Sequence, residues 1–119
     1  MWELFLVVFV SQKHARYLTD IKTNYKATGA MGGYLGNKGG LLLQFSLYDK
    51  KFMFLNCHLA SGAFNSAKRS DMMAKILKDI GFSGVYPDAL ADFCTLMGDM
   101  NYRFKTTYAQ HIDSVQESQ

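Results

Sequence analysis

The stretch LLLQFSLYDKKFMFLNCHLA, residues 41–60, decides the fold expected for this chain. It contains two apolar runs, 41–48 and 52–60, that are rich in leucine and phenylalanine. Between them lie three polar residues, 49–51, a connection short enough to join two neighbouring antiparallel strands. We therefore predict a β-hairpin over this stretch.

Three segments outside the hairpin also have strand patterns. The apolar runs at 3–10 and 92–97 predict buried strands, and 23–28 predicts a short strand. Between 28 and 40 six glycines occur in thirteen residues, which predicts a loop that needs positive φ angles or close backbone approach. The strands therefore lie on both sides of the hairpin in sequence.

A helix is predicted over 66–80, where apolar residues recur at helical spacing. Asn65 or Ser66 is expected at its N-cap and Gly81 at its C-cap. Shorter helical segments are expected at 13–21 and from Thr106 or Thr107 toward Val115. Because strands and helices alternate, the chain belongs to the mixed α/β class, and the hairpin indicates antiparallel pairing in its sheet.

Length and composition limit the chain to one globular domain or part of one. Of its 119 residues, 49% are hydrophobic and 19% are charged, which is typical of a globular protein. The net charge of +3 is compatible with anionic partners but gives no strong footprint for nucleic-acid binding. Two widely spaced cysteines and the absence of a signal-peptide pattern predict a cytoplasmic protein with reduced thiols, and a monomer is expected.

Polar side chains follow two predicted strands at the point where each strand ends. Asn56 and His58 alternate along the second hairpin strand, so they lie on the same side. Asp99 and Asn101 follow the last predicted strand in the same way. A carboxylate can act as a general base toward water, and an amide or imidazole can hydrogen-bond a phosphoryl oxygen. Since α/β proteins often bind ligands at strand ends, these residues indicate a phosphate-handling site.

Each of these residues also has an ordinary structural interpretation. A histidine at a strand end is more often a hydrogen-bonded structural residue, and a Gly-Asp pair often marks a turn. Arg103 could clamp a phosphate, but most arginines are solvated or ion-paired. The segment GNKGG, 36–40, lacks P-loop spacing because Gly39 follows Lys38. The residue types alone therefore leave the reaction open.

Four segments taken in order resemble the inositol polyphosphate 5-phosphatase family of the endonuclease/exonuclease/phosphatase superfamily. They are GNKGG (36–40), NCHLASG (56–62), KRSD (68–71) and GDMNYRF (98–104). Their order and approximate spacing match the family, and the first and last segments are specific in combination. The resemblance covers the central part of the catalytic domain, so residues 1–119 are expected to form an incomplete domain. It implies a partial four-layer α/β sandwich with mixed, mostly antiparallel sheets.

The resemblance implies Mg²⁺-dependent hydrolysis of the 5-phosphate from inositol polyphosphates or phosphoinositides. In this interpretation Asp99 would activate the attacking water, and Asn101 and His58 would hold the scissile phosphate. Substrate-binding roles would fall to Asn37, Lys38, Arg103 and Arg69, the two arginines supporting the site without reacting. The resemblance assigns no metal ligand to a residue of this chain.

The loop AMGGYLG, 30–36, suggests a second kind of contact. Met31, Tyr34 and Leu35 lie beside the expected head-group residues and resemble a membrane-touching lip, which would suit a lipid substrate and a peripheral location. The alternative, that Met31 and Leu35 pack inward, is equally compatible with the sequence.

The sequence also departs from the family pattern. Members carry an Asn motif and a metal-binding Glu upstream of the 3–10 strand, and a basic 4-phosphate reader and an Asp-His pair downstream. None of these is recognisable here, and His111 and Asp113 do not replace the pair. Because catalytic groups act as a set, the isolated chain is expected to be inactive or nearly so. The alternative function is a non-catalytic module that binds phosphoinositide membranes.

Overall fold

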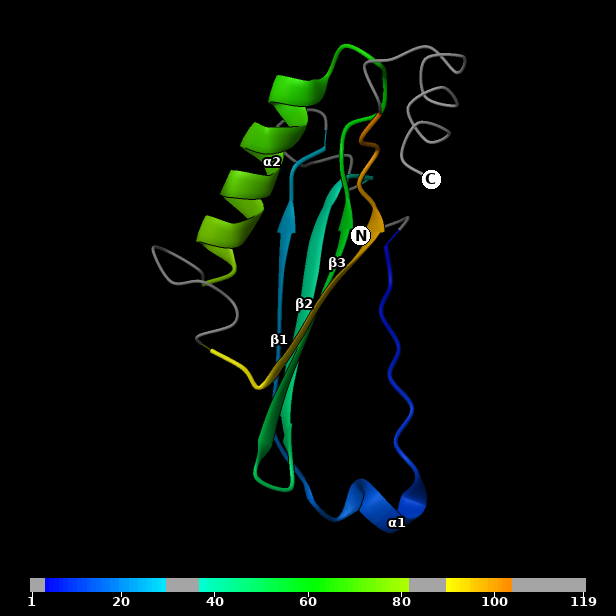
Figure 1. Ribbon diagram of the computed structural model, residues 1–119, viewed down its shortest axis with the longest axis vertical. Coiled ribbons are helices and arrows are strands. Elements are labelled where there is room, and N and C mark those ends of the chain that lie inside the picture. The colour runs from blue at the N-terminus through cyan, green and yellow to red at the C-terminus, as the bar shows by residue number, and fades with distance from the viewer. Residues whose placement is uncertain (1–3, 30–36, 82–89, 104–119) are drawn as a thin grey trace, which may run out of the picture.

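The computed structural model describes residues 4–29, 37–81 and 90–103, which form one mixed sheet with a helix against one face (Figure 1). The sheet has four strands in the order β1-β2-β3-β4. In chain order the elements are α1 (Gln12–Ala15), β1 (Leu18–Ala27), β2 (Gly39–Leu47), β3 (Lys50–His58), α2 (Ser66–Asp79) and β4 (Phe93–Asp99).

The predicted hairpin is confirmed as the antiparallel pair β2–β3. Its register runs from Gly39 opposite His58 to Leu47 opposite Lys50. The connection is tighter than the predicted 49–51, because only Tyr48 and Asp49 lie outside the ladder and Tyr48 adopts a φ of 57°. This hairpin supplies the two middle strands of the sheet.

The outer strands make the sheet mixed but mostly antiparallel, as predicted. β1 pairs antiparallel with β2 and is longer than the predicted 23–28, while β4 pairs parallel with β3. The expectation that 92–97 forms a buried strand is wrong in one respect, since Phe93 is 51% exposed and Leu96 55% exposed. β4 pairs on one side only among the described residues, which leaves its side chains less covered than those of a middle strand.

The hydrophobic core lies between α2 and one face of the hairpin. Met72, Ile76 and Ile80 of the helical segment pack against buried strand residues that include Leu55 and Cys57. Gly40 lies where the helix crosses the sheet, because an added Cβ would be 2.6 Å from Cγ2 of Ile76. The helical periodicity predicted over 66–80 is thus confirmed, and the helix packs tightly enough to require a glycine beneath it.

The ends of α2 agree only partly with the expected caps. Gly81 has a φ of 112°, as expected for the residue that follows a helix. Asn65 occupies the N-cap position, but its side chain makes no capping bond and its amide donates to the carbonyl of Ser61 instead. The side chain therefore orders the loop before the helix and leaves the helix N–H groups uncapped by it.

The N-terminal segment 4–10 is extended but is not the predicted buried strand. Phe5 is 80% exposed and Phe9 93% exposed, and no strand pairing is assigned to the segment. It is held by a hydrogen bond in which Nδ2 of Asn56 donates to the carbonyl of Phe5 over 2.8 Å. Figure 1 shows the segment on the side of the sheet opposite α2. Without a backbone partner among the described residues, its alternate side chains stay open to solvent.

Among the described residues, no helix is both long and apolar enough to cross a membrane. The predicted helix near 106–115 and most of the glycine-rich loop lie outside the described residues. The helix expected over 13–21 is wrong in its second half, because α1 spans only Gln12–Ala15 and the strand β1 begins at Leu18.

Candidate active site

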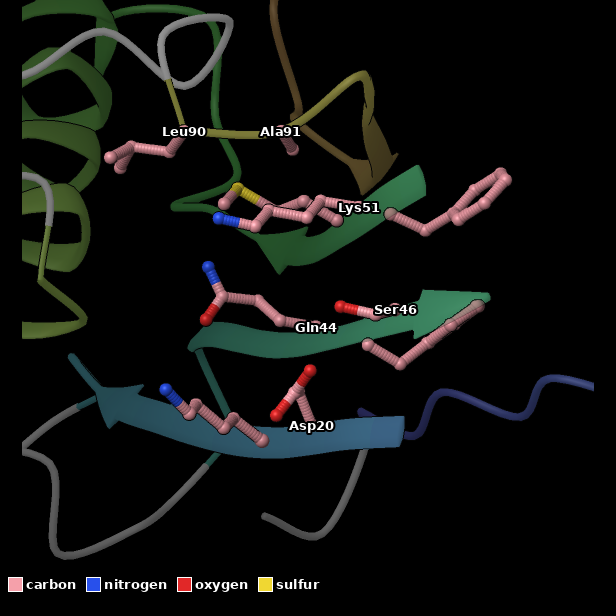
Figure 2. Close-up of a pocket in the computed structure, with 10 residues that line it drawn as sticks. Asp20, Gln44, Ser46, Lys51, Leu90 and Ala91 are labelled. Atoms are coloured by element: carbon pink, nitrogen blue, oxygen red, sulfur yellow. The ribbon is translucent and has the colours of Figure 1, made fainter. Parts of the chain in front are cut away.

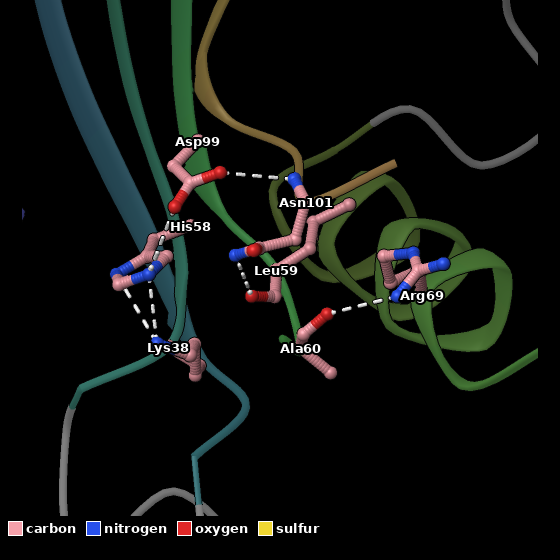
Figure 3. Close-up of polar contacts among 7 residues, drawn as sticks. All are labelled: Lys38, His58, Leu59, Ala60, Arg69, Asp99 and Asn101. Atoms are coloured by element: carbon pink, nitrogen blue, oxygen red, sulfur yellow. Dashed lines mark hydrogen bonds and ion pairs between the residues drawn. The ribbon is translucent and has the colours of Figure 1, made fainter. Parts of the chain in front are cut away.

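Parallel pairing of β3 and β4 brings the first two predicted site residues together. The strands end at His58 and Asp99, and these residues are direct partners in the register. Nε2 of His58 lies 3.7 Å from Oδ2 of Asp99, and the Asp99 side chain is 64% exposed (Figure 3). An imidazole and an accessible carboxylate therefore meet at the carboxyl edge of the sheet, where α/β proteins commonly bind ligands.

Asn101 is held beside this pair by bonds to two chain segments. Its backbone N–H donates to Oδ1 of Asp99, and its side-chain amide donates to the carbonyl of Leu59, both over 3.0 Å. The backbone N–H of Leu59 in turn donates to the carbonyl of Asp99. Asn101 has a φ of 53°, a left-handed conformation that asparagine tolerates better than most residues. These bonds fix its amide next to the carboxylate.

Lys38 reaches the same cluster from the start of β2. Its ammonium lies 2.7 Å from Nε2 and 3.5 Å from Nδ1 of His58 (Figure 3). An ammonium has three donors and no acceptor, so it donates to whichever ring nitrogen carries no proton. Lys38 and Asp99 thus approach the same ring nitrogen, Nε2 of His58, from two sides.

Arg69 lies behind the cluster and is 1% exposed. One of its terminal nitrogens donates to the carbonyls of Ala60 and Gly62, over 3.3 and 2.8 Å. Its guanidinium carbon lies 5.4 Å from the centroid of the Tyr102 ring. The guanidinium thus faces backbone and an aromatic ring, a position that fits support of the site better than direct contact with substrate.

The remaining predicted site residues are less closely defined. Arg103 is exposed, and Asn37 lines a cleft next to the cluster. The predicted membrane contacts Met31, Tyr34 and Leu35 lie outside the described residues. Their roles remain predictions.

Cys57, adjacent to His58 in sequence, does not contribute a nucleophile. Its side chain points to the opposite face of the sheet, where it is completely buried under α2. Burial raises the pKa of this thiol to about 11, because the thiolate would lose its hydration. At neutral pH the thiol is protonated and inert.

A cleft on the described part of the molecule that is larger than the one beside the cluster is not the site. It measures about 400 Å³ and lies around the other end of the hairpin, with Asp20 among lysines and apolar residues (Figure 2). It contains no predicted site residue. The smaller cleft, about 350 Å³, adjoins the cluster through Lys38.

Sequence reasoning missed several residues of this smaller cleft. Thr28, Ser61, Asn65 and Lys68 line it together with Asn37 and Lys38. Lys68 could have been selected from the sequence, because it belongs to the KRSD segment that resembles the family, but only its neighbour Arg69 was predicted as a site residue. Tyr102, which lies against Arg69, likewise belongs to a segment singled out for other residues. Sequence spacing predicts neither the place of Lys68 in the cleft nor the contact of Tyr102 with Arg69, because each brings together segments that are distant in sequence.

Comparisons with known proteins identify the family of this chain. A sequence model described as endonuclease/exonuclease/phosphatase family 2 matches residues 1–119. Inositol polyphosphate 5-phosphatase K of Mus musculus is 36% identical over 107 residues, which are 88% of this chain and 23% of the relative. Phosphatidylinositol 4,5-bisphosphate 5-phosphatase A of Homo sapiens is 32% identical over 108 residues, 89% of this chain and 11% of the relative.

A solved structure is similar as well. It is the inositol polyphosphate 5-phosphatase domain of a synaptojanin in complex with inositol (1,4)-bisphosphate and a calcium ion. The TM-score is 0.67 at 25% identity, over 89% of this chain and 30% of that one. The chain spans less than a third of each of these proteins. It therefore belongs to endonuclease/exonuclease/phosphatase family 2, and its similarity to inositol polyphosphate 5-phosphatases confirms the resemblance predicted from its motifs.

Proposed function

We propose that this chain contributes to the hydrolysis of the 5-phosphate from inositol polyphosphates or phosphoinositides. The observation that carries the proposal is the convergence of Asp99, Asn101 and His58 at the ends of two parallel strands, in a chain similar to 5-phosphatases. The names of the relatives supply the substrate class. Phosphoryl transfer depends mainly on positioning and charge stabilisation, and this cluster offers both.

The roles follow from what each group can donate or accept. The exposed carboxylate of Asp99 can take a proton from the water that attacks phosphorus. The bond to the inositol oxygen breaks, and that oxygen takes a proton from solvent and leaves as a hydroxyl. One N–H of the Asn101 amide is bound to Leu59, which leaves its second N–H for a phosphoryl oxygen. Lys38 has donors to spare and can reach the phosphate that lies against His58.

Magnesium is part of this proposal, but the described residues do not define its ligands. They contain no cluster of three or more His, Cys, Asp or Glu side chains that could hold a metal. Mg²⁺ binds through one or two carboxylates and keeps several waters, so Asp99 alone would be an incomplete ligand set. The ion would offset phosphate charge, and we assign no step of the reaction to it.

The test is a chimera in which this chain replaces the matching segment of the mouse 5-phosphatase K. Phosphate release from inositol 1,4,5-trisphosphate would be measured with Mg²⁺ and with chelator, beside the isolated chain. We expect the folded chimera to release phosphate, and Asp99→Asn to lower kcat at least about a hundredfold, the usual scale for a lost proton-transfer group. His58→Gln removes an imidazole proposed to hold the phosphate, so it should lower phosphate release as well. Lys13→Gln, on α1 at the other end of the sheet, serves as the control.

Three outcomes would decide against all or part of the proposal. A folded chimera that releases no phosphate would show that these residues do not support catalysis. A chimera that binds the trisphosphate without hydrolysing it would favour the alternative, a phosphoinositide-binding module. Equal activity of Asp99→Asn and wild type would remove Asp99 from the reaction.

A further inference from the structure

The larger cleft lies on the face of the sheet that α2 packs against, toward the end of the hairpin that the helix does not reach (Figure 1). Gln44 pairs with Lys22 on one side and with Met53 on the other, so these three side chains share that face. The last residue of α2, Asp79, forms an ion pair with Lys26, and Lys22 lies four residues earlier in β1. The cleft, about 400 Å³ in volume, therefore opens beyond the end of the helix.

Two ammonium groups of this cleft have no acid to neutralise them. Lys22 and Lys51 line it and are exposed, and no carboxylate of the described residues lies within ion-pair distance of either ammonium. The nearby carboxylate of Asp92 accepts the backbone N–H of Lys51 over 2.9 Å and pairs with the ammonium of Lys50 over 3.5 Å. Asp20 is the one acid among the lining residues, so the cleft has an excess of one positive charge.

Hydrogen-bonding and apolar groups lie beside these cations. Gln44 and Ser46 are on β2, the strand between the two lysines, and neither side chain has a hydrogen-bond partner in the described part of the chain. The apolar wall of the cleft consists of Met53, Leu90 and Ala91. Figure 2 shows Leu90 and Ala91 on one side of Lys51, and Gln44 and Ser46 on the other. Polar and apolar groups thus face the same opening.

This mixture favours a peptide over a small anion or a polyanion. Because β2 separates their strands, Lys22 and Lys51 have Cα atoms roughly 10–12 Å apart, a span that suits a ligand longer than a single phosphate. A nucleic acid or an anionic membrane would bring further negative charges against Asp20. A peptide with one acidic side chain matches the excess of one positive charge, and its apolar neighbours match the apolar wall.

We propose that this cleft docks a segment of a partner protein in which one acidic side chain is flanked by apolar residues. Lys22 and Lys51 bind its carboxylate, Gln44 and Ser46 hydrogen-bond its backbone, and the apolar wall covers the flanking side chains. This interaction goes beyond the proposed function and requires no phosphate hydrolysis by this chain.

The docking site is separate from the catalytic cluster. Lys51 and His58 lie seven residues apart in β3, a distance of about 23 Å along an extended strand. The two residues also point to opposite faces of the sheet, since side chains alternate along a strand. A partner segment and a phosphate at His58 can therefore be bound at the same time.

The experiment measures peptide binding to the full 119-residue chain by fluorescence polarisation. The probe is a labelled heptapeptide, Ser-Gly-Leu-Glu-Leu-Gly-Ser, with both ends blocked so that the glutamate is its only charged side chain. Two further probes carry glutamine in place of the glutamate, or three consecutive glutamates. The variants are Lys22→Gln, Lys51→Gln and Asp20→Asn. Lys75→Gln is the matched control, because it removes the same charge from α2 outside the cleft.

We expect the single-glutamate peptide to bind wild type, and Lys22→Gln and Lys51→Gln each to raise its Kd at least about tenfold, the effect of one lost charge-assisted hydrogen bond. Lys75→Gln should leave this Kd unchanged. Asp20→Asn should tighten binding of the three-glutamate peptide by about threefold, because it removes a like charge at an exposed position. Circular dichroism verifies that each variant is folded.

Three results would overturn this proposal. The first is that the single-glutamate peptide does not bind wild type, or binds no better than the glutamine peptide. The second is an equal loss of affinity in Lys75→Gln and Lys22→Gln. The third comes from sedimentation with vesicles containing phosphatidylserine: binding to vesicles that depends on Lys22 and Lys51, without binding to the peptide, would assign the cleft to an anionic membrane instead.

Discussion

The ammonium of Lys38 lies 2.7 Å from Nε2 of His58, although both side chains can carry positive charge. The contact joins the start of β2 to the end of β3, because Gly39 and His58 are partners in the hairpin register. It directs the Lys38 ammonium at the point where the scissile phosphate is proposed to lie. An incoming phosphate could accept from Lys38 in place of the imidazole.

This contact leads to an expectation for Lys38→Met. Loss of the ammonium should weaken inorganic phosphate binding by roughly ten- to a hundredfold, because a charge-assisted hydrogen bond contributes on the order of 1.5–3 kcal/mol. The Kd is measured by calorimetry at fixed ionic strength. Lys13→Met removes the same charge from α1 and should leave the Kd as it is. If both variants bind equally, Lys38 does not contact the phosphate.

Arg69 should be essential for stability where Arg103 is not. Arg69→Leu leaves the carbonyls of Ala60 and Gly62 without their donor, so the free energy of unfolding should fall by about 3 kcal/mol. Arg103→Leu makes the same change at an exposed position and should cost less than about 0.5 kcal/mol. Urea unfolding followed by circular dichroism compares the two. Equal urea midpoints would mean that the buried guanidinium of Arg69 does not stabilise the segment that contains Ala60 and Gly62.

Gly98 and Gly81 share a φ of 112° but differ in their surroundings. A Cβ at Gly98 would clash with the carbonyl oxygen of Cys57 and with Oδ1 of Asn56, whereas a Cβ at Gly81 meets nothing within 4 Å. We expect Gly81→Ala to cost about 1 kcal/mol from backbone strain alone. Gly98→Ala should cost about 3 kcal/mol or more, because β4 has to move away from β3. Thermal midpoints in the same buffer test this difference, and similar shifts would refute the close approach.

Two substitutions distinguish the effect of the left-handed backbone at Asn101 on stability from the effect of its side chain. Asn101→Ala and Asn101→Gly both remove the bond to the carbonyl of Leu59, but only glycine adopts a φ of 53° without strain. The alanine variant should therefore be less stable than the glycine variant by about 1 kcal/mol. Chemical unfolding curves provide the measurement. Both variants should lose phosphate release in the chimera, since neither has the amide.

Cys57 should make stability depend on alkaline pH. Its pKa is raised to about 11 in the fold, from an ordinary value of 9.0, so the unfolded chain releases this proton first. The stabilisation is complete below about pH 9 and is lost as the pH rises toward about 11, by on the order of 2–3 kcal/mol. Cys57→Ala is the reference that removes this contribution while other groups still titrate. Parallel stability profiles of wild type and Cys57→Ala between these pH values would contradict the assignment.

The parts of the fold that could be predicted are those set by neighbouring residues. The hairpin over 41–60 and the helix over 66–80 follow from alternation and from helical spacing, which short segments carry by themselves. The segment 4–10 looks like a buried strand for the same reason, yet it has no pairing among the described residues. A hydrophobic segment tends to be buried, but its sequence does not specify which other segment buries it.

The candidate site shows the same division. The sequence by itself determined which groups are present, Asp99, Asn101 and His58 at strand ends, and their motifs determined the family. Only the tertiary structure decided that β4 lies parallel to β3, that Arg69 is buried behind the loop and that Lys68 faces a cleft with Lys38. Each of these depends on contacts between residues far apart in sequence, whose energies are set by distance, burial and charge in the folded chain.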